Sequence, residues 1–121
     1  MARRALVVDD DPEMRDSVAS VLAGAGYAVE VAKDGEQAIE VQRARPADVL
    51  ITDVFMPSRD GLETIQHFRA AYPQMRIIAM TGGSPTGRVH EYLGVAEVAG
   101  ADVTLRKPFP ARELLESLSA P

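Results

Sequence analysis

The segment VVDDDPEMR, residues 7–15, places three consecutive carboxylates, Asp9, Asp10 and Asp11, directly after an apolar run. Neighbouring like charges repel one another, and each carboxylate loses favourable hydration when it is buried. Such a cluster therefore needs a compensating partner, and the positions of the other polar groups along the chain show what that partner is.

Short apolar runs rich in β-branched residues alternate along the chain with longer segments of helical period. The runs cover residues 5–8, 28–32, 49–52, 77–80 and, more weakly, 102–105. Apolar residues recur at helical spacing between them, as at Met14, Val18, Val21 and Leu22. This alternation predicts an α/β fold, with a parallel sheet that is covered by helices on both faces and has right-handed crossovers.

Helix ends are also marked in the sequence. Asp11 and Pro12 supply an N-cap and a first-turn proline, whereas Gly24 and Gly26 offer a stop. Asp60 with Glu63 three residues later has the pattern of a capping box. A last helix is expected over residues 110–119, and the glycine-rich start of residues 82–100 predicts a loop followed by a helix across 89–98.

Composition predicts one globular domain over residues 1–121, because the chain has 121 residues, of which 46% are hydrophobic and 26% charged. The net charge is −5 and no basic stripe is present, which argues against direct nucleic-acid binding. The chain has no cysteine, which excludes disulfides and thiolate metal sites. The apolar run after Arg4 is too short for a signal peptide or a membrane span, so we expect a cytoplasmic protein without membrane attachment.

Other polar residues stand at the ends of later apolar runs. Asp53 follows the third run, Thr81 the fourth and Lys107 the fifth. In parallel sheets, ligands bind beyond the carboxyl ends of the strands, so these side chains are expected near Asp9 and Asp10. Clustered carboxylates suit a hard cation such as Mg²⁺, and an added hydroxyl and ammonium suit a phosphoryl group.

The motifs VVDDDPEMR, ITDVFMPSRDGLE, MTGG and RKPF occur in this order over the whole chain, which resembles the receiver domain of two-component response regulators. The resemblance implies a three-layer flavodoxin-like fold with strand order 2-1-3-4-5. It implies a phosphoacceptor signalling domain rather than an enzyme, which promotes only its own Mg²⁺-dependent phosphorylation and dephosphorylation. The implied partners are a sensor histidine kinase or phosphotransfer protein, and an output domain or second copy bound through the fourth helix, fifth strand and fifth helix.

The same resemblance assigns roles to individual residues. Asp53 would be the phosphoacceptor, and Thr81 and Lys107 would each contact a phosphoryl oxygen. Mg²⁺ would be bound by the side chains of Asp10 and Asp53, by the backbone carbonyl of Phe55, and by Asp9 through water. The Lys107–Pro108 peptide bond would be cis.

One departure from the receiver pattern concerns the fifth strand, where Thr104 stands in place of the usual aromatic residue. We therefore expect the output to pass through rearrangement of the loop and helix after Thr81.

Simpler interpretations exist for single residues. Asp11 is best explained as a helix N-cap rather than a metal ligand. Thr81 and Lys107, each taken alone, would be an ordinary strand-end threonine and a solvated lysine, and only their shared position gives them significance.

An alternative function is a haloacid-dehalogenase-like phosphatase, because Asp9 and Asp11 have the spacing of the nucleophile and acid of that family. Glu13 stands where that family has Thr or Val. The two functions differ in the aspartate that becomes phosphorylated, which is Asp9 in the phosphatase and Asp53 in the receiver. An inert binding module would lack a member of the motif set, and the sequence retains all of them.

Overall fold

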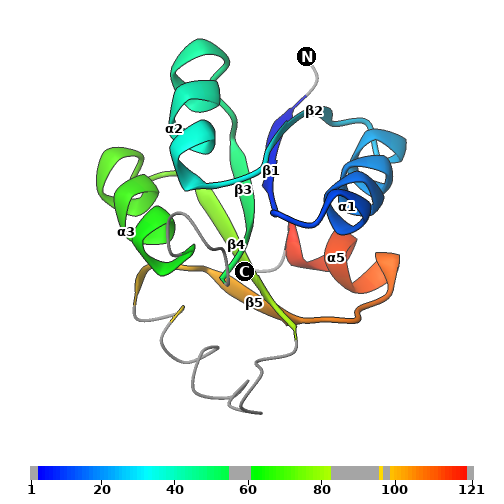
Figure 1. Cartoon of the computed structure of the whole chain (residues 1–121). Helices are drawn as coiled ribbons and strands as arrows, with labels where there is room; N and C mark the ends of the chain where they lie inside the picture. The colour runs from blue at the N-terminus through cyan, green and yellow to red at the C-terminus, as the bar shows by residue number, and fades with distance from the viewer. Residues whose placement is uncertain (1–2, 55–60, 83–95, 97–98, 120–121) are drawn as a thin grey trace.

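The structure is a computed structural model, and it describes residues 3–54, 61–82, 96 and 99–119. Five parallel strands form one sheet in the order β2-β1-β3-β4-β5 (Figure 1). They are β1 Arg4–Val8, β2 Ala28–Ala32, β3 Val49–Asp53, β4 Arg76–Thr81 and β5 Val103–Arg106. The predicted flavodoxin-like order is therefore confirmed.

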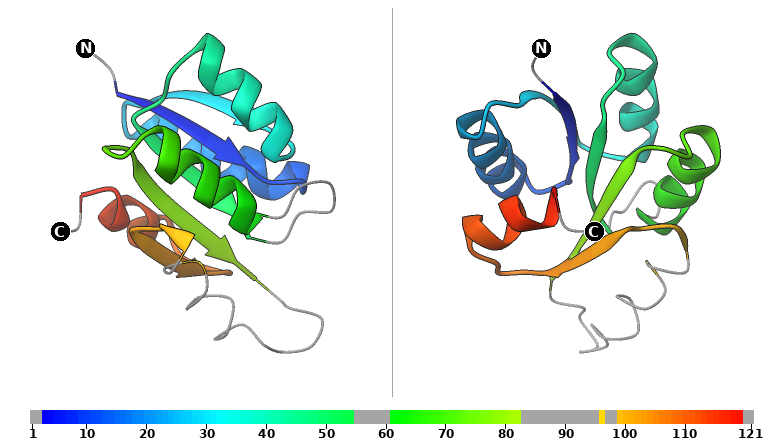
Figure 2. Two further views of the ribbon diagram at one scale, coloured as in Figure 1. Left: turned by 90° about the vertical axis from the view of Figure 1, so that its left-hand side faces the viewer. Right: turned by 180° about the vertical axis from the view of Figure 1, so that it is seen from behind.

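Helices cover both faces of this sheet. They are α1 Pro12–Gly24, α2 Gly35–Ala44, α3 Gly61–Ala71 and α5 Ala111–Ser117. Figures 1 and 2 show α1 and α5 on one face, with α2 and α3 on the other. None of the helices in the described part of the chain has the length and apolar character needed to cross a bilayer.

Each face has its own apolar core because side chains alternate along a strand. Leu6 and Val8 of β1 pack with the α2 and α3 side, whereas Val7 between them packs with the α1 and α5 side. The central strands β1, β3 and β4 are buried over nearly their whole length. Burial on both faces explains why these strands read as continuous apolar runs in the sequence.

The start and end of α1 follow the predicted signals. The side chain of Asp11 accepts a hydrogen bond of 3.1 Å from the backbone N–H of Glu13, which makes Asp11 the N-cap, and Pro12 is the first helical residue. The helix ends at Gly24, and Gly26 has φ of 97°, a conformation that favours glycine. The proposed capping box at Asp60 lies outside the described residues.

The last strand and helix differ slightly from the prediction. β5 begins at Val103 rather than at Asp102, whose carboxylate instead accepts hydrogen bonds from the backbone N–H of Ile77 at 2.8 Å and from Arg69 at 2.6 Å. α5 is shorter than residues 110–119, because Arg76 donates two hydrogen bonds to the carbonyl oxygen of Ser117 and so caps the helix there. Most of the loop and helix predicted between residues 82 and 100 lies outside the described ranges.

Candidate functional site at the carboxyl end of the sheet

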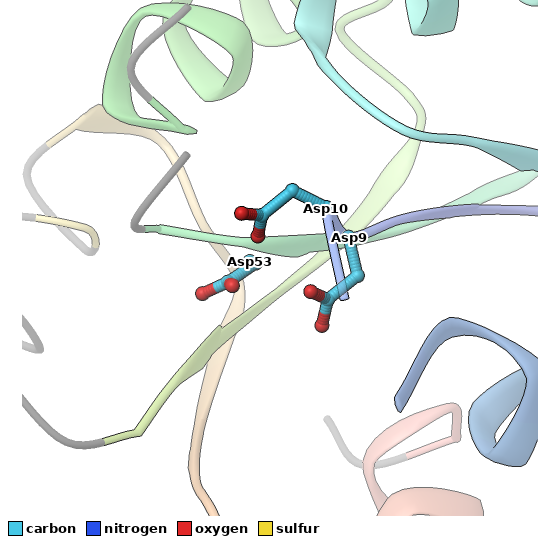
Figure 3. Close-up of side chains that lie close together, drawn as sticks. All are labelled: Asp9, Asp10 and Asp53. Carbon is cyan, nitrogen blue, oxygen red and sulfur yellow. The ribbon is translucent and has the colours of Figure 1, made fainter. Parts of the chain in front are cut away.

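Three carboxylates gather where β1 and β3 end. Asp9 and Asp10 follow β1, Asp53 is the last residue of β3, and the two strands are paired neighbours. One ligand oxygen from each of these residues lies within 4.8 Å of the others, and Figure 3 shows the carboxyl groups around a common space. The crowding expected from the sequence is therefore present, and an oxygen-rich cluster of this kind suits Mg²⁺ or Ca²⁺.

The three carboxylates differ in their surroundings. Asp9 is fully buried, Asp53 is 7% exposed, and Asp10 is open to solvent. Oδ1 of Asp9 accepts a 3.0 Å hydrogen bond from the backbone N–H of Asp11, and Oδ2 accepts one of 2.8 Å from Lys107 Nζ. Asp9 is thus fixed by the protein on both carboxylate oxygens, whereas Asp10 faces water.

Lys107 brings a positive charge to this cluster from the loop after β5. Its Nζ lies 2.8 Å from Asp9 Oδ2 and 3.4 Å from Asp53 Oδ2. Burial alone would lower the pKa of Lys107, but the hydrogen bond to Asp9 and the charges of Asp53 and Asp9 outweigh it, so this pKa is raised above its usual value. The lysine is therefore held in its charged form.

The backbone of Lys107 ties the ends of β4 and β5 together. Its N–H donates a 2.7 Å hydrogen bond to the carbonyl oxygen of Thr81, and the Lys107–Pro108 peptide bond is cis, as predicted. A Cβ placed on Gly82 would lie 2.5 Å from Cβ of Lys107. The lysine stem therefore passes directly over this glycine.

Thr81 ends β4 and is fully buried at the same edge of the sheet. Its Oγ1 has no hydrogen-bond partner among the residues that the structure describes. Buried hydroxyl groups are nearly always hydrogen-bonded, because an unpaired one costs about 1–3 kcal/mol. An unpaired hydroxyl at the end of a strand, close to a cluster of charges, is well suited to a ligand oxygen.

Sequence reasoning missed two residues that shape this site. Gly61, the first residue of α3, packs so closely on β3 that a Cβ there would meet the carbonyl oxygen of Asp53. Arg15 of α1 donates from Nη1 to the carbonyl oxygen of Asp9 at 3.1 Å. Neither contact has a distinctive local pattern, because each joins residues through the folded backbone.

The structure thus brings together Asp9, Asp10, Asp53, Thr81 and Lys107. Phe55, whose carbonyl oxygen is an expected metal ligand, lies outside the described residues. His67 is exposed on α3.

Strand order and the position of this site define a flavodoxin-like α/β protein with its functional groups at the carboxyl end of the sheet. The family model of the response regulator receiver domain matches residues 5–119, and the chain belongs to that family. Receiver domains are phosphoacceptor signalling modules rather than metabolic enzymes, and the matches give no support to the haloacid-dehalogenase-like alternative.

Among curated proteins, the chain is 39% identical over 120 residues to the response regulator MprA of Mycobacterium ulcerans, covering 99% of this chain and 50% of that protein. It is 42% identical over 118 residues to MprA of Mycobacterium leprae, covering 97% of this chain and 50% of the relative. The chain therefore spans about half the length of these relatives.

Solved structures agree with this assignment. A CheY-like receiver domain from Methanospirillum hungatei matches with a TM-score of 0.88 at 29% identity, covering 98% of this chain and 91% of the other. CheY4 of Vibrio cholerae matches with a TM-score of 0.82 at 33% identity, with coverages of 98% and 97%. A response regulator of Burkholderia pseudomallei, whose structure contains a phosphorylated aspartic acid, a calcium ion and citrate, matches with a TM-score of 0.86 at 26% identity, covering 98% of this chain and 67% of that one.

Proposed function

We propose that residues 1–121 act as one receiver unit in which Asp53 accepts a phosphoryl group in a Mg²⁺-dependent reaction. The observation that carries the proposal is the meeting of three carboxylates, the hydroxyl of Thr81 and the ammonium of Lys107 at one edge of the sheet, with no partner for that hydroxyl in the described part of the chain. The donor is a phosphohistidine on a sensor histidine kinase or phosphotransfer protein.

In the transfer, a carboxylate oxygen of Asp53 attacks the phosphorus atom and forms an acyl phosphate. The bond from phosphorus to the histidine nitrogen breaks, and that nitrogen keeps the electron pair and takes a proton from solvent. Asp53 supplies the nucleophile without a separate base, because a carboxylate oxygen carries no proton that must be removed before it attacks.

The residues present fit a divalent cation, because three carboxylates face one ammonium and leave an excess of negative charge. Asp10 and Asp53 would hold Mg²⁺ with their side chains, and Phe55 would do so with its backbone carbonyl. Asp9 would reach it through water, in keeping with the two hydrogen bonds that its oxygens already accept. When bound, the ion would neutralise charge on the transferred phosphoryl group.

Phosphorylation replaces the single negative charge of the Asp53 carboxylate with an acyl phosphate of about −1.5 to −2, which adds about −0.5 to −1 of charge there. Thr81 Oγ1 would then donate to one phosphoryl oxygen, and Lys107 would pair with another in place of its present contacts with Asp9 and Asp53. Because the backbone N–H of Lys107 donates a hydrogen bond to the carbonyl oxygen of Thr81, these changes act together on the ends of β4 and β5. We propose that an output domain or second copy reads them through the helix predicted over residues 89–98, β5 and α5.

The direct test is incubation with Mg²⁺ and a small phosphodonor such as acetyl phosphate, followed by intact-mass and peptide mass spectrometry. We expect one added phosphoryl group on the wild type, none on Asp53→Asn, and none when EDTA removes the metal. Asp48→Asn is the matched control, since Asp48 lies at the opposite end of β3. Phosphorylation of Asp53→Asn at the wild-type rate would overturn the proposal, and modification of Asp9 would favour the phosphatase.

An apolar groove beside the site offers a docking surface for a protein donor. This groove of about 160 Å³ runs between α1 and α5 next to Pro108, and its lining includes Met14, Val18, Val21, Phe109 and Leu114. A partner that places apolar side chains there would bring its phosphohistidine to the same end of the sheet as Asp53.

This docking mode predicts different effects on two kinds of donor. Phe109→Ala should slow transfer from a histidine kinase while leaving phosphorylation by acetyl phosphate unchanged. Leu115→Ala is the control, because Leu115 lies on α5 outside the groove and is 37% exposed. Equal rates of kinase transfer for Phe109→Ala and the wild type would contradict the use of this groove.

A further inference from the structure

Arg15 contacts the acidic turn from within α1. Its half-buried side chain donates from Nη1 to the carbonyl oxygen of Asp9 at 3.1 Å, while its backbone N–H donates to the carbonyl oxygen of Asp11 at 2.9 Å. The guanidinium therefore approaches the turn between β1 and α1 from a rigid element, one helical turn after the cap.

With this contact, every polar group of Asp9 is fixed by the fold. Its N–H donates to the carbonyl oxygen of Ala32 at 3.2 Å, its carboxylate binds Lys107 and the N–H of Asp11, and its carbonyl accepts from Arg15. The next residue differs, because Asp10 is exposed and its carboxylate has no hydrogen-bond or ion-pair partner in the described part of the chain. The position of Asp10 is set by the groups that flank it.

Planarity of the peptide bond links these two residues directly. The carbonyl of Asp9 and the N–H of Asp10 belong to one rigid plane, which also contains the Cα atom of Asp10. A hydrogen bond that fixes the Asp9 carbonyl therefore limits the direction in which the Asp10 side chain leaves the backbone.

We propose that Arg15 is a positioning residue for the metal site, which holds the Asp9–Asp10 peptide plane so that the Asp10 carboxylate stays directed at the cation. The proposal rests on the proposed Mg²⁺-dependent function. Arg15 itself binds neither the metal nor the phosphoryl group.

Charge and position predict opposite results for removal of this arginine. A guanidinium close to a cation site repels the cation, so its charge alone predicts tighter Mg²⁺ binding after Arg15→Gln. Positioning predicts weaker binding instead, since loss of groups that orient metal ligands typically lowers affinity about 10- to 100-fold. The sign of the change separates the two effects.

The choice of metal gives a second distinction. Mg²⁺ requires near-octahedral geometry, whereas Ca²⁺ accepts irregular coordination. Loss of positioning should therefore weaken Mg²⁺ binding more than Ca²⁺ binding, while general damage to the site would weaken both equally.

The experiment is calorimetric titration of the unphosphorylated protein with MgCl₂ and with CaCl₂ for wild type, Arg15→Gln and Arg15→Lys. Arg45→Gln is the control, because Arg45 directly follows α2, is exposed, and pairs with Glu30 of β2 rather than with the acidic turn. We expect Arg15→Gln to weaken Mg²⁺ binding about tenfold and Ca²⁺ binding less. Arg15→Lys should recover part of the loss, and Arg45→Gln should match the wild type.

Unchanged or tighter Mg²⁺ binding by Arg15→Gln would overturn the proposal, as would equal losses for both metals. Thermal unfolding in EDTA establishes that the variants are folded. If Arg15→Gln does not fold, Arg15→Lys tests the proposal instead. This variant keeps the positive charge, so weaker Mg²⁺ binding can arise only from an altered position of the Asp9–Asp10 peptide. A wild-type protein that binds no Mg²⁺ would instead contradict the metal dependence of the proposed function.

Discussion

Lys107 donates a 2.8 Å hydrogen bond to Oδ2 of Asp9, a carboxylate that is completely buried. The other oxygen of Asp9 accepts only a backbone N–H, so Lys107 is its one positively charged partner among the described residues. The lysine thereby balances charge in the acidic cluster before any phosphoryl group arrives.

Lys107→Met should lower the free energy of unfolding of the metal-free protein by about 3 kcal/mol, because it leaves a buried carboxylate without its counter-charge. Saturating Mg²⁺ should reduce this loss, since the cation supplies positive charge to the same cluster. Urea unfolding in EDTA and in MgCl₂ measures both effects. Lys33→Met, which removes the only other lysine in the chain from an exposed position, should have little effect in either condition. A loss that Mg²⁺ does not reduce would contradict this explanation.

The stability of the protein should also depend on Lys107 at high pH. The pKa of Lys107 is raised above its usual value near 10.5, so the folded state binds this proton more tightly than the unfolded state does. The resulting stabilisation is fully present below about pH 10.5 and is lost as the pH rises through the folded-state pKa.

Urea unfolding of wild type and Lys107→Met across the alkaline range measures this dependence. The difference in unfolding free energy between them should stay constant from about pH 7 to pH 9 and shrink above about pH 10.5. A difference that already shrinks below about pH 9 would mean that burial dominates and that the pKa of Lys107 is lowered.

Gly61→Ala should destabilise the fold by about 1–3 kcal/mol through overpacking against β3. The added Cβ would meet the carbonyl oxygen of Asp53 and would lie 2.6 Å from the Cα atom of Val54, and neither backbone atom can easily move. Because the clash is next to Asp53, the rate of phosphorylation by acetyl phosphate should fall as well.

Gly24→Ala is the matched control, since a Cβ at Gly24 would meet nothing within 4 Å. Gly24 lies at the end of α1, where alanine is favoured over glycine by up to about 1 kcal/mol. Thermal or urea unfolding should therefore show opposite signs for the two substitutions. Equal effects would contradict the close packing of Gly61 on β3.

Asp11→Ala should lower the free energy of unfolding by about 1 kcal/mol, because the N-cap hydrogen bond to Glu13 is lost. Asp11→Asn keeps an oxygen that can accept this hydrogen bond, so its stability should stay close to that of the wild type. The Mg²⁺ affinity of Asp11→Asn distinguishes an N-cap from a metal ligand. If Asp11 is only the N-cap, loss of its charge removes no metal ligand. A Mg²⁺ affinity that falls sharply in Asp11→Asn would show that Asp11 is a ligand after all.

Local patterns in the sequence were sufficient to predict much of this fold. The strands β1, β3 and β4 appear as apolar runs because they are buried on both faces. α1 begins at Pro12, directly after its N-cap Asp11, and ends at Gly24, as its capping signals indicated. The gathering of Asp9 and Asp53 followed from one further rule, that parallel strands of a sheet present their carboxyl ends at the same edge.

Contacts between residues that are distant in sequence could not be predicted in this way. Arg69 of α3 donates to the carbonyl oxygens of Pro73, Met75 and Gly100, and also pairs with Asp102 at 2.6 Å. These contacts depend on the path of the backbone after folding, and an arginine on a helix gives no local sign of them. The contact of Arg15 with the Asp9 carbonyl was missed for the same reason.

Asp9 and Lys107 are separated by 98 positions along the chain, yet they meet in the folded protein. Synthesis on the ribosome proceeds from the amino terminus. Asp9 and Asp53 therefore leave the ribosome long before Lys107, whose ammonium group contacts both carboxylates in the folded protein. A nascent chain that has not yet reached β5 carries an acidic cluster without its internal cation. Under the proposed function, the ability to receive a signal is therefore acquired only when the last strand has been made and has joined the sheet.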